Sequence, residues 1–389
     1  MQEDFHYYAT YCAAYLAGYN HEESLTVCYS AQLVDLFSKT LLIRLKGPLI
    51  AATTQLQMEL MDARTDTLGL QDITRIWSAF HFLPRDLYAC TEKKKTKRYM
   101  RKYRLICGPD GDLAKKTVEL AKDKSLQAAG IAMHVLADTW AHMNFAGTPS
   151  LVINNTDDYF YELLDEGERQ VHFRHKAFSP DDPEKGIYTN SLYQNNENSI
   201  MNLGHGRAGH FPDYSFARYK YMPAWGDYEE FIKDNPKDYM KAFCQMVCAL
   251  KYIMEESDTF EPGQYEPENI AEYRERIEGI LKKRQINASA DWKEFARELS
   301  GEEIEDFNLD KYQDEYMTAE GSKKDETFLG LFIKAAIDHK VMVTDEIFRS
   351  GNMLAGYSLE YYENGFRSVK SYMEYLEKLK DVMGQEAAQ

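Results

Sequence analysis

Apolar residues recur at helical spacing along most of the chain, whereas the alternation typical of strands is scarce. Apolar positions three or four residues apart form one stripe along an α-helix, which such a helix buries against the rest of a fold. Asn20 and Glu23 precede the first of these stripes in the order of a capping box. The pattern predicts helices over the following residues: 22–45, 125–144, 234–256, 267–284, 292–316, 327–349 and 358–383.

Residues 156–223 differ from the remainder, because they are rich in Asn, Asp, Gly, Pro and Tyr and show little periodicity. Such a stretch favours long ordered loops. The fold class expected is therefore all-α, a multi-helix bundle with long ordered loops and additional C-terminal helices. An acidic segment containing proline near residue 257 suggests a division into a helical domain over 1–257 and a helical region over 258–389. The second region could equally pack on the same core.

Composition and charge narrow the class of protein. The chain has 389 residues and a formal net charge of −17, which argues against nonspecific binding of duplex nucleic acid. Its six cysteines are dispersed and indicate reduced thiols. No apolar run is long enough for a membrane span, and the N-terminus lacks the basic start of a secretory signal. We therefore expect a cytoplasmic protein without a transmembrane segment.

One predicted helix carries His134, Asp138 and His142, each four residues from the next. This spacing places the three side chains on one face of an α-helix. Imidazole and carboxylate groups are ligands that suit Zn²⁺. The other residues of the helix are mostly apolar, so the polar row points inward, where a cation would offset its desolvation. The alternative is that these side chains pair with one another or lie at the surface.

Further polar residues stand in unusual surroundings. Asp35 interrupts an apolar helical face, His81 lies in the apolar segment SAFHFLP, and His6 lies in DFHYY. A late segment, LGHGRAGHFPDYS, combines two histidines and an aspartate with glycines that let the backbone approach a ligand. Each could instead be a satisfied core residue. Together the candidate metal ligands are His6, Asp35, His81, His134, Asp138, His142, His205, His210 and Asp213. The histidines expected at the surface are His21, His172, His175 and His339.

The order of these motifs, HYY, VD, FHFLP, HxxxDxxxH and GHGxxGxxPD, resembles a bacterial family related to the zinc-dependent phospholipase C and single-strand nuclease superfamily. The resemblance spans roughly residues 1–255. It implies an all-α fold with a cluster of three zinc ions lined by His and Asp from several helices.

The resemblance also implies a role for each ligand. Asp35 and His81, with His134 and Asp138, would hold the central zinc pair. His142 and Asp213 would hold another ion with either His205 or His210, and His6 would serve the site nearest the N-terminus. In the exported members the mature chain begins with a Trp whose α-amino group and carbonyl also bind zinc. Here Met1 stands at that end, and Asp4 is a candidate substitute.

These residues predict a metal-dependent hydrolase of phosphoester bonds with two or three divalent ions, in which Asp35 also acts as the general base. The expected substrate is a small phosphodiester or a phospholipid headgroup, and a nucleic acid is less favoured. The alternative is a noncatalytic, metal-stabilised helical protein that binds a partner through its basic segment. That segment holds eight cations between Lys93 and Arg104, with two tyrosines interleaved. It could meet a phosphate-rich substrate, an anionic membrane surface or nucleic acid, or be an ordinary solvated helix or loop.

Overall fold

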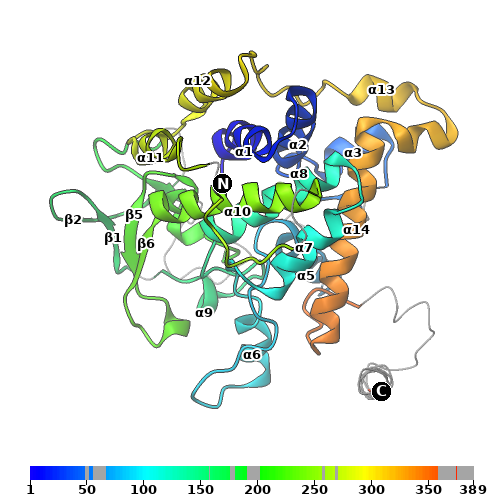
Figure 1. Cartoon of the computed structure of the whole chain (residues 1–389). Coiled ribbons are helices and arrows are strands. Elements are labelled where there is room, and N and C mark those ends of the chain that lie inside the picture. The colour runs from blue at the N-terminus through cyan, green and yellow to red at the C-terminus, as the bar shows by residue number, and fades with distance from the viewer. Residues whose placement is uncertain are drawn as a thin grey trace, which may run out of the picture.

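The computed structural model describes residues 1–48, 52–55, 67–156, 158–175, 180–190, 202–255, 259–267, 270–357 and 374. A layer of packed helices forms its centre (Figure 1). Helix α8 lies in the middle of this layer and packs against helices on both sides. The helices of the layer are α1 (Thr10–Ala17), α2 (His21–Leu33), α5 (Thr67–Phe80), α7 (Asp112–Ala121), α8 (Leu126–Ala141), α10 (Asn235–Ile253) and α14 (Phe328–Arg349).

Several predicted helices are confirmed, namely those that became α8, α10 and α14. The capping box is also confirmed, since the Asn20 side chain accepts from the Glu23 amide and the Glu23 side chain accepts from the Asn20 amide. The predicted helix over 267–284 is shorter than expected and is limited to α11 (Arg274–Lys282). The predicted helix over 358–383 falls almost entirely outside the described residues.

Two predicted helices are each divided in the structure. Residues 22–45 form α2 and α3 (Lys39–Leu45), because Ser38 caps a new helix by accepting from the Leu41 amide. The break between them holds Asp35. Residues 292–316 form parts of α12 (Ser289–Ser300) and α13 (Gln313–Thr318), since Gly301 takes a left-handed conformation and ends α12.

The all-α expectation is wrong, because the chain also forms a four-stranded antiparallel sheet in the order β2-β1-β5-β6. A short parallel pair, β3-β4, lies in the same part of the chain. The fold is therefore mixed α and β. The strands are β1 (Phe160–Leu163), β2 (Glu168–Gln170), β3 (Arg174–His175), β4 (Thr189–Asn190), β5 (Arg218–Tyr221) and β6 (Phe231–Asp234).

The periodicity of the sequence did not indicate these strands, because none of the strands in the described residues exceeds four residues. Alternation over so few positions cannot be distinguished from a loop. It is nevertheless present, since β5 alternates half-buried basic residues with the buried Tyr219 and Tyr221. These rings join Phe160 of β1 in an aromatic cluster that covers one face of the sheet.

The interior consists of two hydrophobic clusters that meet near His81. The larger cluster runs from Met1 to Ala355, so the described helices after residue 257 pack on the same core as the earlier ones. The smaller is the aromatic cluster under the sheet. Phe80 belongs to the larger cluster and Phe82 to the smaller, which leaves His81 at the junction. Among the described residues, none of the helices combines the length and apolarity that a membrane crossing requires.

Candidate metal centre

The central helix α8 provides the floor of the site. His134 and Asp138 lie one turn apart on it, and His142 caps its C-terminal end. Helix α2 packs closely on α8 at Gly130, where a Cβ atom would lie 2.4 Å from the Val27 carbonyl oxygen. This close approach brings Asp35, just beyond the end of α2, to the same side chains, with its Oδ1 3.9 Å from His134 Nε2.

Three other segments complete the site. His6 lies in a turn of π-helix, η1 (Asp4–Ala9), and His81 follows α5 directly. The late segment folds into two turns of 3-10 helix, η3 (Gly206–Ala208) and η4 (Phe211–Asp213). His205 and His210 stand at the N-caps of these turns, and Asp213 ends the second. Residues that are far apart in the sequence therefore converge on one end of α8.

The described residues include three groups whose ligand atoms lie within 4.8 Å of one another. The first is His6, His134 and Asp138, and the second is Asp35, His81 and His134. The third consists of His142, His205 and Asp213. Eight of the nine candidate ligands therefore belong to groups that could hold a metal ion.

The ninth candidate, His210, stands beside these groups. Its Nδ1 lies 3.3 Å from Asp213 Oδ2, and its side chain is 45% exposed. The sequence left His205 and His210 as alternatives, and the structure places His205 in the group with Asp213. Asp4, the candidate substitute at the N-terminus, does not join the groups, because its Oδ2 accepts from the Ala288 amide.

Four of the imidazoles are each held by a backbone carbonyl. One ring nitrogen of each lies 2.6 to 3.0 Å from a carbonyl oxygen. A carbonyl only accepts, so the nitrogen facing it carries the proton and the other nitrogen is left with a lone pair toward the site. This arrangement is typical of metal-ligating histidines. The pairs are His81 with Thr54, His134 with Ala31, His142 with His81, and His205 with Gly209.

This orientation of the rings brings unprotonated nitrogens close to one another and to the Asp138 carboxylate. Nε2 of His134 lies 3.3 Å from Nδ1 of His81, and both lie within 3.4 Å of Asp138 Oδ2. Three acceptors so close together repel one another unless a proton or a metal ion lies between them. These three atoms, each with a lone pair, therefore form a set of ligands that fits a cation. Because His134 offers only Nε2, it can serve the first group or the second, but not both at once.

The α-amino group of Met1 lies in the same place. Its nitrogen is 2.7 Å from Asp138 Oδ1, 3.3 Å from His142 Nε2 and 3.5 Å from Asp213 Oδ1. Burial alone would lower the pKa of this amine, but the three carboxylates Asp138, Asp213 and Asp35 outweigh it and raise the pKa to about 11. No side-chain motif could have indicated this group, because it belongs to the backbone terminus.

The ionisation of the other groups follows from the same charges. Burial, with the neighbouring His134 and the α-ammonium group, lowers the pKa of His6 to about 3. Burial also lowers the pKa of His205 to about 4, against the attraction of Asp213. Burial would raise the pKa of Asp138, but His142, the α-ammonium group and His134 hold it well below its usual range. His6 and His205 are therefore neutral and Asp138 and Asp213 are charged near pH 7, the forms in which imidazoles and carboxylates bind metals.

The family model for DUF6765, described as a family of unknown function, matches residues 1–347. The chain belongs to this family. The matched DUF6765 region contains all nine candidate ligands. No curated protein and no solved structure matches the chain.

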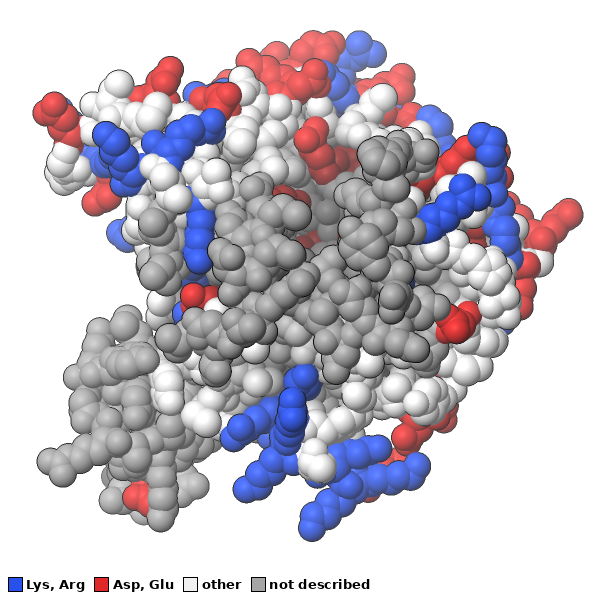
Figure 2. All heavy atoms as spheres, turned by 180° about the vertical axis from the view of Figure 1, so that it is seen from behind, with Lys and Arg blue, Asp and Glu red and all other residues white. Residues whose placement is uncertain are grey.

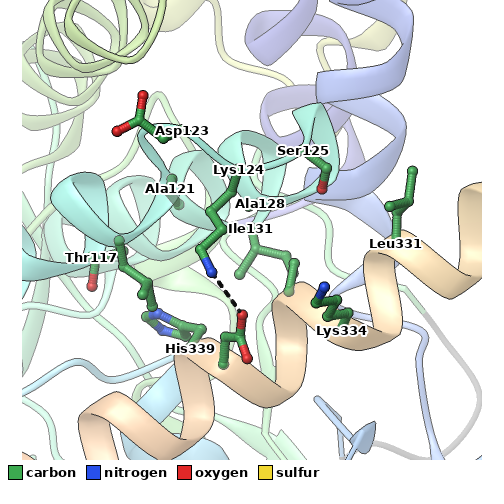
Figure 3. Close-up of a pocket in the computed structure, with 14 residues that line it drawn as sticks. Thr117, Ala121, Asp123, Lys124, Ser125, Ala128, Ile131, Leu331, Lys334 and His339 are labelled. Atoms are coloured by element: carbon green, nitrogen blue, oxygen red, sulfur yellow. Dashed lines mark hydrogen bonds and ion pairs between the residues drawn. The ribbon is translucent and has the colours of Figure 1, made fainter. Parts of the chain in front are cut away.

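This DUF6765 chain has a second feature near α8, a pocket of about 250 Å³ between α7, the start of α8 and α14 (Figure 3). Lys124 and Asp338 form an ion pair across it, 3.4 Å apart. His339, which was expected at the surface, is buried beside it, with Nε2 2.8 Å from the Ala79 carbonyl. None of the candidate ligands lines this pocket.

Proposed function

We propose that the chain is a metal-dependent hydrolase of phosphoester bonds, with zinc as the expected metal. The observation that carries the proposal is the set of four imidazoles held by backbone carbonyls, each of which points its remaining nitrogen at a cluster with three carboxylates. The resemblance of the sequence motifs to the zinc-dependent phospholipase C and nuclease superfamily adds the reaction class. We propose that each chain binds two or three metal ions.

The number of ligands favours catalysis over a purely structural metal. A structural zinc site is closed by four protein ligands, whereas a catalytic site keeps a position for water or substrate. Here eight side chains make up three groups, with His134 counted in two of them, which leaves each group short of a fourth protein ligand. The site is also open at one edge, because the Asp35 side chain is 24% exposed while His134 and Asp138 are almost fully buried.

Divalent ions bound here would lower the pKa of water toward about 7 and would withdraw charge from a phosphoryl oxygen. The chain's own residues then have three tasks. His81, His134, His142 and His205 are held rigidly by their backbone partners, so little reorganisation is needed during the reaction. Asp35, at the open edge, is placed to orient a water molecule and accept its proton. His210 lies at the exposed rim beside Asp213, where a substrate would enter.

We further propose a small phosphodiester or a phospholipid headgroup as substrate and a cytoplasmic location. A long nucleic acid is less favoured, because the chain has a net charge of −17. The noncatalytic alternative, a helical protein that metal ions only stabilise, is the competing outcome of the experiment below.

The test is hydrolysis of a chromogenic nitrophenyl phosphodiester by the zinc-loaded protein, by the chelated protein and by the protein reloaded with zinc. We expect turnover that chelation abolishes and reloading restores. Asp35→Asn, assayed at a zinc concentration that keeps its metal content equal to that of the original protein, should lower kcat by about a hundredfold or more, as expected for loss of a general base. Asp325→Asn, at an exposed carboxylate away from the site, is the matched control. Bound metal without turnover of any phosphodiester, together with unfolding on chelation, would establish the structural alternative instead.

A further inference from the structure

A basic projection, defined here as residues 85–106, extends from the body of the molecule next to the metal centre. It leaves the body after Pro84 and returns at Cys107, and these two residues pair as an isolated antiparallel bridge. The base of the projection, where Pro84 and Cys107 pair, is close to the candidate metal centre. His81 lies three residues before Pro84, and the Cys107 thiol lies 4.0 Å from the Asp138 carbonyl oxygen. Figure 1 shows the projection, with its helix α6 (Lys97–Tyr103), standing out from the fold.

The projection concentrates positive charge in an acidic protein. Eight cations lie between Lys93 and Arg104, and Figure 2 shows Lys and Arg gathered at the end of the molecule where α6 lies. Lys93 and Lys95 both approach Asp227, at 3.3 and 3.8 Å. Four further cations are exposed and form no ion pair with the described part of the chain, namely Lys94, Lys97, Arg98 and Arg101.

The local sequence explains why these charges point outward. Thr96 caps α6 by accepting from the Tyr99 amide. Tyr99 and Tyr103 lie one turn apart and stack with ring centroids 5.9 Å apart, and Tyr103 also contacts Trp225. The tyrosines thus form the inner face of the helix, and the remaining positions, which are mostly basic, form the outer face.

Two large exposed aromatic side chains, Tyr88 and Tyr228, accompany the charges. Tyr88 is 57% exposed and precedes Ala89, whose carbonyl accepts from Arg104 Nε. Tyr228 is 61% exposed and follows Asp227, the partner of Lys93. Its backbone φ of 63° is uncommon for a bulky residue.

We propose that the basic projection docks the protein on an anionic lipid surface. Clustered Lys and Arg side chains are attracted to anionic headgroups, and tyrosines are favoured at the level of those headgroups. The shape also fits a plane, because a projecting tip can touch a bilayer while the acidic body stays away from it. Binding of single-stranded nucleic acid requires a groove that follows the backbone, and the charges here lie on a projection instead.

Docking in this way would hold the metal centre at a set distance from the lipid, since both ends of the projection are anchored beside it. The inference goes beyond the proposed hydrolase and does not depend on it. The experiment therefore measures binding alone, so its failure leaves the hydrolase proposal untouched.

The test is cosedimentation of the full chain with vesicles of phosphatidylcholine alone or of equal parts phosphatidylcholine and phosphatidylserine. We expect binding only to the anionic vesicles, and weaker binding as salt is raised. The variant with Lys94, Lys97, Arg98 and Arg101 replaced by Gln should bind at least about tenfold more weakly, because each cation near the surface adds to the attraction. The matched control replaces four cations elsewhere that are also exposed and form no ion pair with the described part of the chain, namely Lys46, Lys241, Lys323 and Lys334.

Two further variants keep the test decisive. If the fourfold variant does not fold, the single substitution Lys94→Glu takes its place and should also weaken binding. Tyr228→Ser should weaken binding without any change in charge. The proposal is overturned if the protein ignores anionic vesicles, if it binds neutral vesicles equally, or if the control variant loses as much binding as the fourfold variant. Tighter binding to a single-stranded oligonucleotide than to the vesicles, with the same dependence on the four cations, would assign the surface to nucleic acid and also overturn it.

Discussion

Replacing Asp138 with Asn removes the carboxylate that most of the site shares. Oδ1 of Asp138 lies 3.1 Å from His6 Nε2 and 2.7 Å from the α-amino nitrogen of Met1. Its Oδ2 lies 3.2 Å from His134 Nε2 and 3.4 Å from His81 Nδ1. The substitution changes the charge while it keeps the size of the side chain, so it tests electrostatics rather than packing.

The magnitude follows from Coulomb's law. Two unit charges 4 Å apart attract by about 4 kcal/mol at an effective dielectric constant of 20. A divalent ion in contact with the carboxylate is closer and doubly charged, although the amide oxygen recovers part of the loss as a neutral ligand. We therefore expect the dissociation constant of the ion between His6, His134 and Asp138 to rise by roughly a thousandfold or more.

The assay is metal content per chain, measured by elemental mass spectrometry after dialysis against buffered zinc. Asp138→Asn should lose at least one ion but keep the ion of the group with His142, His205 and Asp213. Asp213→Asn should show the opposite pattern. His172→Ala, at an exposed histidine, is the control for nonspecific effects and should retain the full complement.

An Asp138→Asn variant that is folded and binds as many ions as the original protein would refute the reasoning. So would an original protein that binds no divalent ion after reloading, because the close acceptor atoms would then have to be satisfied by protons. Circular dichroism of each variant separates loss of metal from loss of fold.

Three other predictions follow from the same structure. The α-ammonium group of Met1 competes with a cation for Asp138, so residues added before Met1 should displace this positive charge and raise the affinity for metal, whereas the same residues added after Gln389 should not; equal affinity would contradict competition by the amine. Chelation should lower the melting temperature of the protein, and zinc should restore it, because a ligand that binds only the folded state stabilises it; an unchanged melting temperature would contradict metal binding. Burial lowers the pKa of His339 from 6.5 to about 4. Between these pH values the unfolded state binds a proton at His339 that the folded state does not bind. The free energy of unfolding therefore falls as the pH drops from 6.5 to 4. His339→Gln should remove about 3 kcal/mol of this acid sensitivity, measured by urea unfolding at pH 7 and pH 4, and an unchanged pH dependence would show that His339 is not the cause.

The sequence alone determined the parts of the site that one helix arranges. His134, Asp138 and His142 share a face because four residues advance only slightly more than one helical turn, whatever the rest of the chain does. The same local rule determined the capping box of Asn20 and Glu23 and the extents of α8, α10 and α14. Local motifs also identified the eight side chains that converge, because polar residues in apolar surroundings are costly without a partner.

Tertiary structure decided everything that depends on residues far apart in the chain. The small sheet was missed because strands of two to four residues are stabilised by their partners and not by their own pattern. His205 rather than His210 belongs to the group with His142 and Asp213, and the Gly209 carbonyl orients its ring, neither of which the spacing reveals. The α-amino group of Met1 meets Asp138 across 137 residues because the adjoining η1 packs on α2 and α8. Periodicity acts over a few residues, whereas packing brings distant residues together, and the candidate metal centre needed both.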